Sequence, residues 1–253
     1  MTKMKNILIL ILLSLVIWGC GGSENTVNMS PEDRLAYAVK LYNNEDYEQA
    51  VNEFSSIVLQ FPGNAVVDSA QYYTGMTRYQ RKEYILAAYE FSKLIKNMLA
   101  SKLISESQYM LAECYYKLSP DFTLDQKYTR SAIKEYQAYI DFFPTSDKVP
   151  DAEVKIKELN EKLAHKEYNA AYIYSKLEFY RAALKYYDNV VEIYHDTKYA
   201  PLAMYDKTRL LISRDRNADA LIEINKFLEK YPSSDYVKDM RDLKNNLEIS
   251  ASK

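Results

Sequence analysis

Small and apolar residues recur at a fixed spacing five times along the chain. Each segment holds a small residue followed twelve positions later by an alanine, and the third segment carries eight additional residues between the two. The pairs are Ala38 and Ala50, Gly75 and Ala87, Ala112 and Ala132, Ala171 and Ala183, and Thr208 and Ala220. Bulky residues follow each alanine at offsets of 4, 7 and 11, which lie on one face of a helix. The pattern predicts five pairs of amphipathic helices that cross closely at the small residues.

The repeated unit has the pattern of the tetratricopeptide repeat, a helix-turn-helix of about 34 residues. Each unit needs its neighbours to bury its apolar stripe, so the units are expected to stack into a solenoid. Proline follows the second helix at Pro62, Pro144 and Pro232, where it ends the helix because it lacks an N–H donor. After the last proline, residues 233–247 predict a capping helix with a polar outer face. The expected fold is all-α, with five repeats plus the C-terminal capping helix.

The spacing also suggests two lobes. Residues 31–148 hold repeats 1 to 3, and residues 149–249 hold repeats 4 and 5 and the cap. Residues 151–177 contain neither proline nor glycine, which predicts one helix of about 40 Å between the lobes. Ser30-Pro31 reads as an N-cap followed by proline at the first helical position. The additional residues of the third repeat predict a loop around residues 118–124.

The N-terminus has the pattern of a secretory signal. Lys3 and Lys5 precede an apolar run over residues 7–17, which is too short to span a bilayer comfortably. The run ends in Trp18-Gly19-Cys20, which resembles a bacterial lipobox apart from the bulky tryptophan. We expect residues 1–19 to be a lipoprotein signal peptide and residues 20–30 to be a flexible tether lipidated at Cys20. The alternative is an uncleaved N-terminal anchor helix, and both readings place the rest of the chain at a membrane, outside the cytoplasm.

Composition and charge exclude several classes of function. A formal charge of −2 gives no electrostatic footprint for nucleic acid. Once Cys20 is acylated, Cys114 is the remaining cysteine, so no intramolecular disulfide can form. His165 and His195 have no carboxylate at ligand spacing, and there is no glycine-rich phosphate loop or nucleophile elbow. We therefore expect no metal, no cofactor and no enzymatic activity.

Tyrosine recurs at the positions where the first helix of each repeat should line the concave surface. A tyrosine ring offers apolar area and a polar group at low entropic cost, which suits peptide binding. The residues predicted to form a peptide-binding groove are Tyr42, Tyr72, Met76, Tyr79, Tyr109 and Tyr116. The alternative is that these rings pack between repeats. Arg78 and Lys117 lie nearby in the sequence and could meet a C-terminal carboxylate.

The segment from Lys162 to Met204 resembles the BamD family of outer-membrane lipoproteins. The matching residues are Leu163, Ala164, Tyr172, Ala182, Ala183, Tyr194, Asp196, Thr197 and Ala200. Residues 143–146 and 231–234 repeat the same helix-end signature. Two positions depart from the family pattern: His195 replaces a usual proline, and Tyr186 stands where an arginine is common.

The resemblance implies a non-catalytic scaffold of the machinery that assembles outer-membrane β-barrels. The N-terminal lobe would bind unfolded barrel substrates through their C-terminal, aromatic-ending segment, and the C-terminal lobe would dock on a BamA-type barrel protein. Gly21 after Cys20 favours the outer membrane, with the protein facing the periplasm. Two other functions stay open: an envelope scaffold linked to the Tol-Pal system, and a periplasmic accessory protein that holds the substrate of an enzyme.

Overall fold

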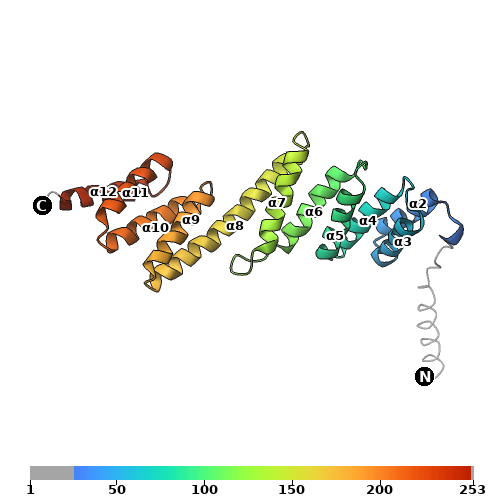
Figure 1. Ribbon diagram of the computed structural model, residues 1–253, viewed down its shortest axis with the longest axis horizontal. Coiled ribbons are helices and arrows are strands. Elements are labelled where there is room, and N and C mark those ends of the chain that lie inside the picture. The colour runs from blue at the N-terminus through green and yellow to red at the C-terminus, as the bar shows by residue number, and fades with distance from the viewer. Residues whose placement is uncertain (1–25, 252–253) are drawn as a thin grey trace, which may run out of the picture.

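A computed structural model describes residues 26–251, and all regular elements in this range are helical. They are η2 (Thr26–Asn28), α2 (Pro31–Asn43), α3 (Tyr47–Gln60), α4 (Val67–Gln80), α5 (Tyr84–Asn97), α6 (Ile104–Leu118), α7 (Lys127–Phe142), α8 (Val149–Lys176), α9 (Tyr180–Ile193), α10 (Tyr199–Ser213), α11 (Asn217–Lys230) and α12 (Val237–Ala251). The helices follow one another in a single elongated row from α2 to α12 (Figure 1). Five hairpins, α2–α3 to α10–α11, are closed by α12, which confirms the predicted all-α repeat fold.

The small residues lie where the two helices of each hairpin cross. All nine alanines and threonines of the five pairs are fully buried, and Gly75 is buried as well. A Cβ atom added to Gly75 would lie 2.7 Å from the Phe91 ring, so a side chain at this position would force the helices apart. The residues four positions after each alanine form the centre of the core. They are Phe54, Phe91, Tyr136, Tyr187 and Ile224, each at most 2% exposed.

The ends of the row follow the predicted chemistry. The Ser30 hydroxyl accepts a hydrogen bond from the Asp33 backbone N–H at 3.1 Å, as an N-cap does. At the other end, Met240 and Leu247 of α12 are buried against α10 and α11. The helices α3, α7 and α11 each stop two residues before a proline. Both the start of the repeats and the capping helix therefore agree with the sequence prediction.

Tight turns join the two helices in four of the hairpins. Each turn places one residue in the left-handed region: Glu45, Lys82, Glu178 and Asp215, with φ between 57° and 64°. In the first turn, the N–H of Asp46 donates to the carbonyl of Leu41, which is the hydrogen bond of a Schellman motif. The third hairpin has a loop over residues 119–126 instead, where the extra residues were predicted.

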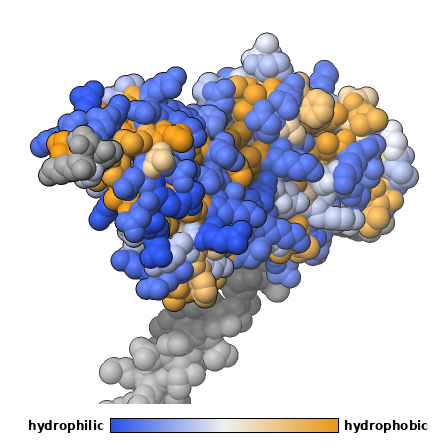
Figure 2. Space-filling model, turned by 60° about the vertical axis from the view of Figure 1, so that its left-hand side comes forward, coloured by the Kyte–Doolittle hydropathy of each residue, from blue (hydrophilic) through white to orange (hydrophobic). Residues whose placement is uncertain are grey.

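One long helix connects the third and fourth repeats. α8 has 28 residues, which corresponds to a length of about 42 Å, and it agrees with the predicted continuous helix. Its first half packs on α7, and its second half pairs with α9. Among the described residues, no helix combines the length and apolar character that a bilayer span requires. The face shown in Figure 2 is mixed, with small apolar areas separated by polar side chains.

Candidate peptide-binding surface

Five of the six predicted groove residues, Tyr116 among them, keep part of their side chain open to solvent, and Tyr109 is buried. Tyr42 of α2 and Tyr72, Met76 and Tyr79 of α4 are half-buried. The Tyr42 hydroxyl accepts a hydrogen bond from Nε2 of Gln80 at 3.3 Å, which links the first helices of repeats 1 and 2. These four residues are called the α2–α4 surface below.

Tyr72 and Tyr79 combine packed rings with available hydroxyl groups. The Tyr72 ring lies 5.8 Å from the Phe91 ring, and the Tyr79 ring lies 5.3 Å from the Tyr84 ring. Within residues 26–251, neither hydroxyl has a hydrogen-bond partner. Burial, together with the nearby charge of Glu113, raises the pKa of Tyr79 to about 12. Both groups are therefore neutral phenols at physiological pH, able to donate a hydrogen bond to a ligand.

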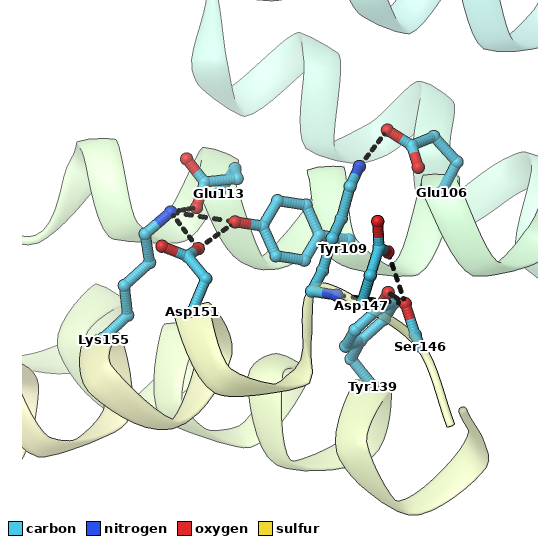
Figure 3. A network of polar contacts seen from close by, with 9 residues as sticks. Glu106, Tyr109, Glu113, Tyr139, Ser146, Asp147, Asp151 and Lys155 are labelled. Carbon is cyan, nitrogen blue, oxygen red and sulfur yellow. Dashed lines mark hydrogen bonds and ion pairs between the residues drawn. The ribbon is translucent and has the colours of Figure 1, made fainter. Parts of the chain in front are cut away.

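The two groove residues of repeat 3 contact α8 instead. Tyr109 is 9% exposed, and its hydroxyl donates to Asp151 and accepts from the Lys155 ammonium at 3.0 Å (Figure 3). The Tyr116 hydroxyl donates to Glu158 at 2.7 Å. Tyr109 is thus packed against α8, whereas Tyr116 stays half-buried and bonds α8 through its hydroxyl.

Lys155 is the centre of this contact between α6 and α8. Its ammonium pairs with Glu113 and lies 3.0 Å from a carboxylate oxygen of Asp151. The ammonium also lies within 5.3 to 5.7 Å of the centres of three tyrosine rings, those of Tyr109, Tyr116 and Tyr136. Aromatic faces attract a cation at this range. The side chain of Lys155 thus fills the space beside the repeat 3 tyrosines.

The α6–α8 contact follows a regular register. Each pair joins residues 42 positions apart, and the partners step along both helices at alternating intervals of three and four residues. The pairs are Glu106 with Lys148, Tyr109 with Asp151, Glu113 with Lys155, and Tyr116 with Glu158. The α8 partners of these residues were not predicted from the sequence. Their alternating spacing of three and four residues is visible in the sequence, but the register depends on the path of the chain between the helices.

Hydrogen bonding shifts the pKa values of Asp151 and Lys155. The hydrogen bond from Tyr109 outweighs burial and holds the pKa of Asp151 below its usual range. Burial lowers the pKa of Lys155, but hydrogen bonds with Glu113, Tyr109 and Asp151 outweigh it and raise the pKa above the ordinary lysine value. Asp151 and Lys155 are therefore both charged at neutral pH.

We expect the contribution of Asp151 to stability to depend on pH with a defined sign. Because its pKa is lower in the folded state, the contribution is present above the ordinary value of 3.8 and is lost as the pH falls through the folded value. The difference in denaturation midpoint between the wild type and Asp151→Asn should be constant from about pH 5 to pH 8 and shrink towards about pH 2. A difference that persists unchanged at the acidic end would contradict the assignment.

The two cations suggested as carboxylate ligands lie in different surroundings. The guanidinium of Arg78 already forms ion pairs with two carboxylates, that of Glu83 at 3.2 Å and that of Glu90 at 3.5 Å. Lys117 is exposed, and its ammonium lies 5.9 Å from the centre of the Tyr116 ring. Lys117 is therefore the more available of the two for an anionic ligand.

The described residues carry no arrangement suited to catalysis. No group of three or more histidine, cysteine or acidic residues within 26–251 could hold a metal ion. His165 is stacked on Phe122, with ring centres 3.6 Å apart, and on Tyr199 at 4.8 Å. Cys114 is fully buried, and burial raises the pKa of its thiol well above the usual range, which makes it unreactive. Cys20 and the predicted signal peptide lie outside the described residues.

Comparisons with known proteins support the resemblance noted in the sequence. Residues 28–218 match the family model of YfiO, an outer membrane lipoprotein. The chain is 26% identical over 198 residues to the outer membrane protein assembly factor BamD of Rickettsia prowazekii, covering 78% of this chain and 79% of that protein. It is 23% identical over 215 residues to BamD of Caulobacter vibrioides, covering 83% of this chain and 70% of that protein.

Among solved structures, the chain is similar to the TPR2AB domain of yeast Sti1, at 15% identity and a TM-score of 0.40, over 86% of this chain and 98% of that one. The two bacterial relatives are both named as assembly factors, in agreement with the expectation of a protein without catalytic activity. The family match covers the described chain from its first residues into the fifth repeat. The chain therefore belongs to the YfiO family of outer membrane lipoproteins, the family of the assembly factor BamD.

Proposed function

We propose that the protein is a non-catalytic scaffold of the outer-membrane β-barrel assembly machinery. In this proposal the N-terminal lobe, residues 31–148, binds unfolded barrel substrates, and the C-terminal lobe, residues 149–249, docks on a BamA-type barrel protein. The observation that carries the proposal is the family match over residues 28–218, in a chain whose α2–α4 surface leaves tyrosines open. A stacked row of hairpins supports this role because it presents an extended surface without needing an active site.

The α2–α4 surface is the part of the predicted groove best suited to a peptide. Its rings are held in place by packing against neighbouring aromatics, so little side-chain entropy is lost when a ligand binds. The free hydroxyls of Tyr72 and Tyr79 can bond the backbone of an extended segment, while Met76 between them adds an adaptable apolar contact. Tyr109 and Tyr116 would act indirectly, by holding α8 at the end of the groove.

Replacing Tyr72 and Tyr79 together with leucine should weaken binding of a barrel C-terminal peptide about 10-fold or more, since aromatic anchors dominate such contacts. Fluorescence anisotropy with a labelled peptide that ends in an aromatic residue measures the affinity. Tyr89→Leu is the matched control, because Tyr89 is 64% exposed on α5 and lies outside the surface. If the double variant bound like the control, the groove assignment would be wrong.

The partners themselves are tested by purification from solubilised membranes. The protein, tagged at its C-terminus, should co-purify with a large barrel protein that carries periplasmic repeats. Recovery of only peptidoglycan-associated proteins would refute the proposal and favour the Tol-Pal alternative.

The proposed anchor is a lipid on Cys20, with the folded chain facing the periplasm. Two or more acyl chains make attachment effectively stable, at about 0.8 kcal/mol per buried methylene. Cys20→Ala should therefore move almost all of the protein out of the outer-membrane fraction, either as soluble protein or as retained precursor. Cys114→Ala, the matched control at the buried thiol, should leave the fractionation unchanged. Co-fractionation of Cys20→Ala with the outer membrane would defeat the lipoprotein assignment.

A further inference from the structure

A separate small pocket lies in the C-terminal part of the chain, between the end of α8 and α10. Its volume is about 260 Å³, which suits a side chain. Its walls include Tyr172 and Lys176 of α8, Asp206 and Arg209 of α10, and Tyr187 of α9. None of these residues belongs to the α2–α4 surface.

Tyr187 brings a phenolic hydroxyl group to the wall of the pocket. Tyr187 is 2% exposed, and within residues 26–251 its hydroxyl has no hydrogen-bond partner. Burial raises the pKa of Tyr187, and the further influences come from Asp206, Tyr172 and Arg209, which are all pocket residues. Tyr187 is itself a lining residue of the pocket. The hydroxyl is not sealed from solvent, so it is available to donate a hydrogen bond to a ligand in the pocket.

The neighbouring Tyr168 shows the contrast. Its hydroxyl donates to a carboxylate oxygen of Asp206 at 2.6 Å, and its ring lies 6.0 Å from the Tyr187 ring. Asp206, the one carboxylate that lines the pocket, is thus already engaged by a donor from α8. Within the described residues, Asp206 does not accept a hydrogen bond from the Tyr187 hydroxyl.

Two cations at the mouth of the pocket are poorly compensated. Arg209 has a side chain that is 61% exposed, and its nearest carboxylate oxygen, on Asp206, is 3.9 Å away. The Lys176 ammonium has no acidic partner within the described residues and lies 5.2 Å from the centre of the Tyr172 ring. Two positive groups against one shared carboxylate leave the pocket positive, although the chain as a whole carries a formal charge of −2. The charge of the pocket is therefore complementary to an anion.

The walls favour a peptide over a free ion. The ring of Tyr172 lies beneath Lys176 in the wall, and the ring of Tyr205, just outside the lining residues, lies 5.6 Å from the Arg209 guanidinium. These rings add apolar area beside each cation, which a polypeptide backbone covers and an inorganic ion does not. We propose that the pocket binds the side-chain carboxylate of a glutamate or aspartate in an extended segment of a partner protein. Arg209 and Lys176 pair with the carboxylate, and Tyr187 donates a hydrogen bond to it. The proposal is independent of the role in barrel assembly.

Peptide selection with counter-selection tests this assignment on the full mature chain. Phage displaying random 12-residue peptides are bound to the wild type after depletion on the Arg209→Gln/Lys176→Gln double variant. The depletion removes peptides that bind elsewhere, including those on the α2–α4 surface. The surviving peptides should share an acidic residue, and its replacement by the corresponding amide should weaken binding at least about 10-fold.

Variants of the protein then assign the contacts. Arg209→Gln should weaken binding of a selected synthetic peptide by about 10-fold, and Tyr187→Phe, which keeps the buried ring, by about 3-fold or more. Arg214→Gln is the matched control, because that arginine lies over the Tyr180 ring, outside the pocket, and should bind the peptide unchanged. Circular dichroism confirms that each variant is folded.

Several results would overturn the proposal. The first is that no peptide survives counter-selection, or that the survivors lack an acidic residue. The second is that Arg209→Gln and Arg214→Gln bind equally well. The third is that inorganic phosphate displaces the peptide at equal concentration, which would assign the pocket to a phosphate group instead.

Discussion

Replacing Phe91 with alanine is expected to lower the free energy of unfolding by about 3–5 kcal/mol, the usual range for a fully buried aromatic residue. Phe91 is fully buried in the second helix of repeat 2. Its ring contacts Tyr72 and fills the space left by the missing side chain of Gly75. Urea denaturation followed by circular dichroism measures the change. Tyr89→Ala on the same helix is the control, and because Tyr89 is largely exposed its effect should stay within about 0.5 kcal/mol.

A second substitution tests the close crossing itself. In the wild type, Gly75→Ala introduces a methyl group 2.7 Å from the Phe91 ring, and overpacking of this kind costs about 1–3 kcal/mol. In the Phe91→Ala background the ring is absent, so the same substitution should stabilise the protein by up to about 1 kcal/mol through helix propensity. The predicted change of sign is specific to the geometry. An equal effect in both backgrounds would show that the two helices do not cross at Gly75.

Lys155→Met is expected to lower the free energy of unfolding by about 2–3 kcal/mol, since it removes charge-assisted hydrogen bonds to Glu113 and Asp151. It leaves the Glu113 carboxylate, whose side chain is 11% exposed, without its cation. Lys157→Met is the matched control, because Lys157 is an exposed residue on the same helix. Chemical denaturation of the two variants gives the comparison, and equal losses would mean that the α6–α8 contact does not stabilise the fold.

The regular part of the fold follows from residues that recur at fixed spacing. The helix crossings can be predicted because only a small side chain fits where two helices meet closely. Examples are Ala38, Ala87 and Ala183, which are all fully buried in the structure. The capping helix is predictable because Met240 and Leu247 lie on one face of a polar segment. The long α8 is predictable because nothing in residues 151–177 interrupts a helix.

Other features depend on contacts between helices that are far apart in the sequence, which a local residue pattern does not determine. The burial of Tyr109 depends on how the loop over residues 119–126 and α7 carry the chain back to α8, which sets the 42-residue register. The free hydroxyl of Tyr187 appears only once α8 and α10 are placed around it. Glu45 and Lys82 adopt the left-handed backbone conformation although neither is a glycine, the residue that usually marks it. Their conformation was therefore not predictable from the sequence either.

Conditional depletion of the protein, followed by measurement of folded barrel proteins in the outer membrane, tests the proposed scaffold role most directly. Folded barrels are distinguished from unfolded chains by their mobility in electrophoresis before and after heating. The proposal predicts that many different barrels fall together while their unfolded precursors accumulate, and that lipoproteins without a barrel keep their levels. Unchanged levels of folded barrels after depletion would contradict it.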